Sequence, residues 1–134
     1  MSQENVEIIR RGHEAFNRGD LDAVVADLAP EFEYVTSGVI TDAGRGYRGA
    51  EEYRQLLEGL FFAEFSEVRV EGNEFIDVGD QVLVAVTMHG RGKRSGAETS
   101  WSFFQVSTLR EGMVTRGEGF ENRAEALEAL GMRE

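Results

Sequence analysis

The chain contains 134 residues, carries a formal net charge of −11 and has no cysteine. This length suits one domain with its own core, so we expect a single domain over residues 1–134. The lack of cysteine excludes disulfides, thiolate nucleophiles and cysteine metal sites. The negative charge disfavours nucleic acid and acidic membranes as partners. Because no signal peptide or membrane-spanning apolar run is recognisable, we expect a cytoplasmic protein.

Helical spacing of apolar residues marks the first part of the chain. Over residues 2–18, apolar side chains recur every three or four positions, and Gly19 ends this stretch. Asp20 is expected to cap a second helix that continues to Pro30, because proline lacks the amide hydrogen that a helix needs. A third helix is expected from Ala50 onward. Its buried face comprises Tyr53, Leu56, Leu57 and Leu60.

Alternation of apolar and polar residues, which is typical of strands, marks the second part of the chain. A short strand at 32–36 and a glycine-rich loop at 37–49 are expected between the second and third helices. Further strands are expected at 68–71, 73–77, 82–89, 98–109 and 113–120. A short helix then runs from the Asn122 cap to Gly131. This order predicts an α+β fold, in which three N-terminal helices pack across a curved antiparallel sheet and enclose a pocket.

Four motifs occur in an order and spacing that point to one family. They are EAFNRGDLD at 14–22, YRG at 47–49, GRG at 90–92 with SG at 95–96, and RAEALEALG at 123–131. On these motifs the chain resembles the SnoaL-like family of the nuclear transport factor 2 superfamily, which also contains the ketosteroid isomerases. The resemblance implies a cone-shaped sheet, a pocket between sheet and helices, and a homodimer built sheet to sheet. The superfamily holds both enzymes and non-catalytic binding modules, so the resemblance leaves the function open.

The residues that carry ketosteroid isomerisation in this superfamily do not recur here. Those isomerases use an aspartate base and an oxyanion hole made of a tyrosine and a protonated aspartate. Aligned on Gly19-Asp20 after the first helix, the tyrosine position falls on Gly12 and the base on Thr36. Aligned on the Glu111-Gly112 turn, the second aspartate falls on Gln105. We therefore do not expect ketosteroid isomerisation, although the Gln105 amide could still donate a hydrogen bond to a carbonyl.

Strand alternation assigns the side chains that face the pocket. If Gln105 points inward, Trp101 and Phe103 share its face, and the cavity is mostly apolar. The ligand-binding candidates are Tyr34, Thr36, Met88, Trp101, Phe103, Gln105 and Thr115, with Gly117 and Gly119 widening the cavity. The aromatic side chains either hold a flat apolar ligand or fill the core. Gln105 either meets a ligand or water, or bonds to Thr36 or the backbone, and a slip of one residue in register would invert the assignment.

Two side chains are candidate acid–base groups. Glu121 could act as an acid or base in an apolar site, and the alternative is an exposed position just before the Asn122 cap. His13 lies on the apolar stripe of the first helix, so it either belongs to the core or reaches the pocket. No residue spacing indicates a metal site and no motif indicates a cofactor, so we expect neither.

Two functions fit these observations. The first is a cofactor-free isomerase, cyclase, dehydratase or hydrolase that acts on a hydrophobic cyclic substrate. The second is a non-catalytic dimeric module that binds a ligand or associates with a protein. The outer sheet face is expected to carry Leu83, Ala85, Thr87, Phe104, Val106, Val114 and Phe120. Because so much apolar surface should not stay exposed, we expect a homodimer through this face.

Overall fold

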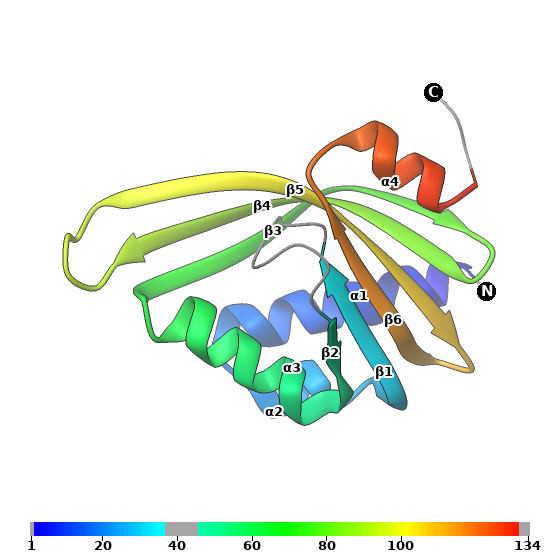
Figure 1. The fold of residues 1–134 in the computed structure, drawn as a ribbon, viewed down its shortest axis with the longest axis horizontal. Coiled ribbons are helices and arrows are strands. Elements are labelled where there is room, and N and C mark those ends of the chain that lie inside the picture. Colours follow the sequence, from blue (N-terminus) through cyan, green and yellow to red (C-terminus); the bar gives the residue numbers. More distant parts are fainter. Residues whose placement is uncertain (1, 37–45, 132–134) are drawn as a thin grey trace.

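A curved sheet of six strands forms the centre of the protein, and the computed structural model describes residues 2–36 and 46–131 (Figure 1). The elements are α1 (Ser2–Arg18), α2 (Leu21–Val25), β1 (Leu28–Thr36), β2 (Gly46–Arg48), α3 (Gly49–Leu57), the π-helical turn η1 (Glu58–Phe62), β3 (Phe65–Val78), β4 (Gln81–Gly92), β5 (Glu98–Arg110), β6 (Met113–Phe120) and α4 (Arg123–Ala129). The strands lie in the order β2-β1-β6-β5-β4-β3. The N-terminal helices, the curved sheet and the short C-terminal helix confirm the predicted α+β fold.

The sheet is mixed rather than wholly antiparallel. Neighbouring strands run antiparallel in every described pairing except that of β1 with β6, which is parallel. The whole segment from β2 to β5 connects these two strands, and a connection of that length allows them to run in the same direction. The parallel pairing places Tyr34 of β1 beside Gly117 of β6.

The helices occupy both faces of the sheet, with α1, α2 and α3 across one face and α4 on the other (Figure 1). Two hydrogen bonds fix α1 to the edge strand β3. Asn17 Nδ2 donates to the Val70 carbonyl at 3.0 Å, and the Val70 amide donates to Asn17 Oδ1 at 2.7 Å. Each such bond contributes about 1 kcal/mol. His13 lies about one helical turn before Asn17, so the same attachment directs it toward the sheet.

The second helix is shorter than predicted, and the first strand is longer. Asp20 caps α2 as expected, since its Oδ1 accepts from the Ala23 amide at 3.1 Å. The helix nevertheless ends at Val25, and Pro30 lies inside β1. Because β2 pairs with β1 only at residues 33–35, the missing amide hydrogen of Pro30 interrupts no bond to β2.

One long strand replaces the two strands predicted at 68–71 and 73–77. β3 runs through both ranges, and its register with β4 shifts between Gly72 and Glu74. Glycine suits this irregularity, because a Cβ atom at Gly72 would lie 2.6 Å from the Phe75 ring. The bulge therefore bends a continuous strand at the point where the sequence suggested a break.

A short strand occupies the end of the predicted glycine-rich loop at 37–49. β2 pairs with β1 there and brings Tyr47 into the core, where this side chain is buried. Residues 37–45 of the predicted loop lie outside the described part of the chain.

The helix α4 covers part of the outer sheet face. Asn122 Oδ1 accepts from the Glu125 amide at 2.8 Å, and Gly131 follows the helix with a φ of 78°, as predicted. Beneath α4, Leu83 and Val106 are completely buried. These two side chains thus lie on the outer face as predicted, and the chain's own last helix covers them.

Candidate functional site

A cavity of about 120 Å³ lies between the inner face of the sheet and the helices α1, α2 and α3. Its apolar lining consists of Ile8, Ile9, Gly12, Phe16, Val24, Leu28, Phe32, Leu56, Leu57, Phe61, Val70, Met88, Phe103, Val114 and Gly117. Its polar lining consists of His13, Asp27, Tyr34, Tyr53, Gln105 and Ser107. Because apolar side chains dominate, the cavity suits an apolar molecule that a few polar groups orient.

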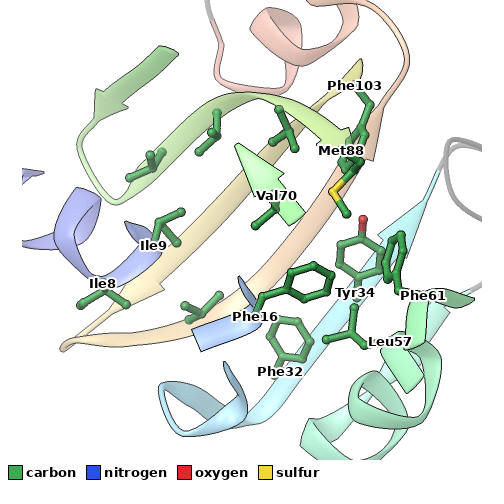
Figure 2. Close-up of a cluster of buried hydrophobic side chains, with 14 of the residues drawn as sticks. Ile8, Ile9, Phe16, Phe32, Tyr34, Leu57, Phe61, Val70, Met88 and Phe103 are labelled. Carbon is green, nitrogen blue, oxygen red and sulfur yellow. The ribbon is translucent and has the colours of Figure 1, made fainter. Parts of the chain in front are cut away.

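Tyr34 places a hydroxyl group in this cavity without giving it a partner. The side chain is 1% exposed, and its oxygen has no hydrogen-bond partner among the described residues. Figure 2 shows this oxygen directed toward Met88. Burial first, and then the neighbouring Tyr53 and Tyr47, hold the pKa of Tyr34 well above its usual value. The group is therefore a neutral phenol that is free to donate a hydrogen bond.

Gly117 makes room for this ring on the adjacent strand. A Cβ atom at Gly117 would lie only 2.9 Å from Tyr34 Cδ1, which is closer than real Cβ atoms approach. The sequence predicted that Gly117 faces inward, and the structure confirms it. The glycine does not widen the cavity as expected, however, because the Tyr34 ring occupies the space that the missing side chain leaves.

Tyr53 and Gln105 form a hydrogen-bonded pair beside Tyr34. The Tyr53 ring, which α3 supplies, lies 5.3 Å from the Tyr34 ring between centroids. Burial raises the pKa of Tyr53 to about 12, and the bond with Gln105 opposes this rise. The Gln105 amide therefore shares a hydrogen bond with the Tyr53 hydroxyl, whereas the neighbouring Tyr34 hydroxyl has no partner among the described residues.

Tyr53, Asp27 and Ser107 are polar lining residues that the sequence analysis did not assign to the site. Tyr53 was assigned to the buried face of the third helix together with three leucines, and that position was right. The one available signal was the hydroxyl group, since a buried tyrosine usually needs a hydrogen-bond partner. For Gln105, the predicted alternatives were a ligand or water, Thr36 and the backbone. Among the described side chains, the partner of Gln105 is Tyr53, which was not among these alternatives.

His13 lines the cavity from α1. Of its two predicted positions, the core and the pocket, the pocket is therefore the one observed. Burial first, and then the positive charge of Arg10, lower its pKa from 6.5 to about 4. The imidazole is therefore uncharged at neutral pH. Asp27 lies in the same lining, where Arg11 Nη2 donates to its carboxylate at 3.0 Å and about 30% of its side chain is exposed. This ion pair marks the solvent-facing edge of the cavity.

The predicted strand faces hold for most of the ligand-binding candidates. Tyr34, Met88, Phe103 and Gln105 all line the cavity. Thr36 ends β1, where its backbone pairs with Gly119, and its side chain lies outside the described part of the structure.

Thr115 was predicted to face the cavity, and this was wrong. The β5–β6 register shifts there, because Thr108 pairs with Arg116 whereas its neighbour Leu109 pairs with Val114. Two residues of β6 thus oppose one step of β5, which reverses the faces at this point. Val114 consequently enters the cavity lining rather than the outer face, and Thr115 Oγ1 donates to the Thr108 carbonyl at 3.2 Å.

Trp101 and Glu121 also lie outside the cavity lining. Trp101 stacks against Phe61 and Phe65, with ring centroids 6.3 and 5.8 Å apart, so it belongs to the core. Glu121 is exposed at the bend between β6 and α4. Of its two predicted positions, the exposed one before the Asn122 cap is observed, because β6 ends at Phe120 and the chain then turns away from the sheet.

A second, open groove of about 750 Å³ lies along β3, β4 and β5. Its lining is largely polar, and the charge of Arg91 is balanced there by Glu67 at 3.1 Å and by Glu98 at 2.5 Å. Within residues 2–36 and 46–131, no group of three or more histidine, aspartate or glutamate side chains could hold a metal ion. None of the described helices is long and apolar enough to cross a membrane. The smaller cavity, with its unpartnered buried hydroxyl, is therefore the candidate site.

The chain belongs to the SnoaL-like family, because the profile of the SnoaL-like domain matches residues 9–117. Among solved structures, TerC co-crystallised with polyporic acid is 24% identical, with a TM-score of 0.75 over 89% of this chain and 92% of TerC. AclR from Streptomyces galilaeus is 17% identical, with a TM-score of 0.77 over 98% of both chains. A Catenulispora acidiphila protein with a ketosteroid isomerase-like fold, in complex with trimethylamine, is 17% identical, with a TM-score of 0.71 over 94% of this chain and 93% of that one. No curated protein matches the sequence.

Proposed function

We propose that the cavity binds a small, uncharged cyclic molecule and holds one of its oxygen atoms by a hydrogen bond from Tyr34. The observation that carries this proposal is the buried Tyr34 hydroxyl, which has no partner among the described residues. A buried polar group left without a partner costs about 1–3 kcal/mol. An acceptor on a bound molecule would remove that cost, while the apolar walls would hold the rest of the molecule.

A carbonyl oxygen suits this site better than a charged group. The raised pKa values of Tyr34 and Tyr53 keep both phenols protonated at neutral pH. Their rings are neighbours, with centroids 5.3 Å apart. The Tyr34 hydrogen has no acceptor among the described residues, so it is available to a neutral acceptor such as a carbonyl oxygen.

Proton transfer beside that carbonyl is a second candidate function, because His13 lines the same cavity as an uncharged imidazole. Its unprotonated ring nitrogen would take a proton from the carbon next to the carbonyl. The C–H electron pair would then move into an enolate, whose oxygen Tyr34 would stabilise. Return of the proton to the far end of a conjugated enolate would isomerise the molecule without a cofactor. A pKa of about 4 makes His13 a weak base, so this role depends on that stabilisation.

A binding module without chemistry is the alternative to the proton-transfer role. Two structural neighbours support a small-molecule role of either kind, since TerC was co-crystallised with polyporic acid and the Catenulispora acidiphila protein with trimethylamine. The two roles differ in what they require of His13. Hydrogen–deuterium exchange at the carbon beside the carbonyl of cyclohex-2-enone separates them. The enzyme accelerates exchange and loses this effect in His13→Gln, whereas the module accelerates nothing.

Ligand titration followed by NMR tests the binding proposal, because a molecule this small is expected to bind with a Kd on the order of 1 mM. Tyr34→Phe should bind cyclohex-2-enone about tenfold more weakly than the wild type. Tyr47→Phe is the matched control, since Tyr47 is a buried tyrosine outside the cavity lining, and it should bind like the wild type. Equal binding by all three proteins, or binding by none, would overturn the proposal.

We also propose that two copies associate through the part of the outer sheet face that α4 leaves uncovered. Phe104 and Phe120 pair across β5 and β6 at the margin of α4, where both pack against the cluster beneath that helix and remain half-buried. Of the large hydrophobic side chains in the described residues, only Val78 is exposed, so the apolar area available for association is small. Sedimentation equilibrium at micromolar concentration should give the mass of a dimer, and a monomer would remove this proposal.

A further inference from the structure

We infer that the molecule held in this cavity has a single ring, and that Phe61 sets this limit. The inference rests on the proposed function, because it concerns the same cavity. The cavity has a volume of about 120 Å³. Pockets for drug-sized molecules measure roughly 300–1,000 Å³, whereas an apolar cavity of about 150 Å³ accommodates benzene. A four-ring steroid or a fused polycyclic compound is therefore too large for the observed cavity.

The wall formed by Phe61 is stiff because a series of aromatic rings backs it. Phe61 meets Phe16 edge to face on the cavity side, with centroids 5.5 Å apart. Behind it, Trp101 stacks on Phe61 and Phe65 stacks on Trp101. Phe65 in turn covers Gly90, where a Cβ atom would lie 2.7 Å from Phe65 Cδ1. The Phe61 ring therefore has no room to retreat toward the sheet, and the cavity cannot lengthen in that direction.

Local backbone geometry aims Phe61 into the cavity. The residue belongs to η1, the π-helical turn that directly follows α3, and its side chain is buried. The wider π-helical turn changes the angular spacing of side chains relative to α3. As a result, Phe61 lines the cavity, whereas its neighbour Phe62 packs against Phe16 from outside the lining, with ring centroids 5.2 Å apart. The pair supplies one phenylalanine that limits the cavity and one that serves as a control.

Charge narrows the ligand class further. Among the lining residues only Asp27 is charged at neutral pH, and Arg11 already pairs with it at the edge. No lining side chain offers a positive charge to a carboxylate or phosphate, because His13 is neutral. Burial of an unpaired ligand charge among the apolar walls would be unfavourable. The ligand class is therefore a neutral one-ring carbonyl compound, such as a cyclic enone.

A series of neutral ketones with an increasing number of rings tests this inference. Cyclohex-2-enone, the two-ring 1-tetralone and the four-ring androst-4-ene-3,17-dione are titrated into the wild type, Phe61→Ala, Phe62→Ala and Tyr34→Phe. We expect the wild type to bind the one-ring ketone and to bind 1-tetralone at least about tenfold more weakly. Phe61→Ala should bind 1-tetralone at least about tenfold more tightly than the wild type does, and Phe62→Ala should bind it like the wild type.

The outcomes separate this inference from the proposed function. If the wild type binds 1-tetralone or the steroid as tightly as cyclohex-2-enone, and Tyr34→Phe weakens all of them, the one-ring limit is wrong while the cavity proposal stands. If no ketone binds, or Tyr34→Phe binds all of them unchanged, the cavity proposal itself fails. Should Phe61→Ala not fold, Phe61→Leu replaces it. The affinities of the wild type for the three ketones still decide the size limit. Recovery of 1-tetralone binding by Phe62→Ala alone would also overturn the role assigned to Phe61.

Discussion

Tyr34→Phe is expected to stabilise the ligand-free protein, although substitutions of buried residues usually destabilise. The Tyr34 hydroxyl is buried without a partner, so the folded state bears the cost of removing it from water, which is about 1–3 kcal/mol. Phenylalanine keeps the ring beside Gly117 and removes only the oxygen. The free energy of unfolding should therefore rise by about 1–3 kcal/mol.

The same change can be expressed as a melting temperature. For 134 residues, an unfolding entropy of about 2.1 cal/mol/K per residue gives a total of about 0.28 kcal/mol/K. A gain of about 1–3 kcal/mol therefore raises Tm by about 4–11 °C. Urea denaturation and calorimetry of the ligand-free protein measure both quantities. The stabilised variant should at the same time bind cyclohex-2-enone more weakly, so stability and affinity move in opposite directions.

Tyr53→Phe is the matched comparison, because it is expected to lower the free energy of unfolding whereas Tyr34→Phe raises it. The Tyr53 hydroxyl is hydrogen-bonded to Gln105, so its removal leaves the half-buried Gln105 amide without that partner. We expect Tyr53→Phe to lose about 1–2 kcal/mol of stability. A Tyr34→Phe variant that loses about 1 kcal/mol or more, as a hydrogen-bonded tyrosine would, refutes the reasoning, because the hydroxyl must then have a stabilising partner in the ligand-free state.

Three further predictions concern the residues around the cavity. His13 has a pKa of about 4 in the folded state and 6.5 as its ordinary value, so between these values the unfolded chain binds the proton and stability falls as pH falls. Urea titrations should show that the free energy of unfolding of the wild type falls by about 3 kcal/mol more than that of His13→Gln between pH 6.5 and below pH 4. The same pH dependence in both proteins would contradict this. Gly117→Ala should cost about 1–3 kcal/mol and weaken ligand binding, because its Cβ meets the Tyr34 ring, whereas Gly59→Ala, whose Cβ meets nothing within 4 Å, should do neither. Asn17→Ala should lose about 2 kcal/mol, measured by urea denaturation, because two hydrogen bonds to β3 disappear, and an unchanged stability would show that they do not hold α1 in place.

Most of the sheet residues that line the cavity could be predicted from the sequence, because strand alternation fixes the face of the sheet on which each side chain lies. Gln105 and Phe103 share a parity on β5, and one buried face fixes the register for the whole strand. The same rule failed at Thr115, where a bulge in β6 reverses the faces. Bulges of this kind depend on how two strands fit together, and no residue type near Thr115 signalled this one.

The hydrogen-bonding chemistry of the site was harder to predict than its shape. Tyr34 was expected at the cavity, but the missing partner of its hydroxyl depends on the positions of every neighbouring side chain. Tyr53 looked like a core residue, because on a helix a stripe of apolar residues marks the buried face without marking which member borders a cavity. For Glu121, alternation extended one residue past the end of β6 suggested the cavity, whereas the adjacent Asn122 cap indicated the exposed position that is observed. These errors share a cause, which is that local patterns do not record where an element stops or what lies across from it.

The carbonyl stretching frequency of bound cyclohex-2-enone tests the central claim most directly, because a hydrogen bond to the carbonyl oxygen lowers this frequency. Infrared difference spectra of the ketone with the wild type, with Tyr34→Phe and with Tyr47→Phe make the measurement. We expect a lower frequency in the wild type and in Tyr47→Phe than in Tyr34→Phe. The same frequency in all three proteins would contradict it, because the Tyr34 hydroxyl would then not be the group that holds the ligand.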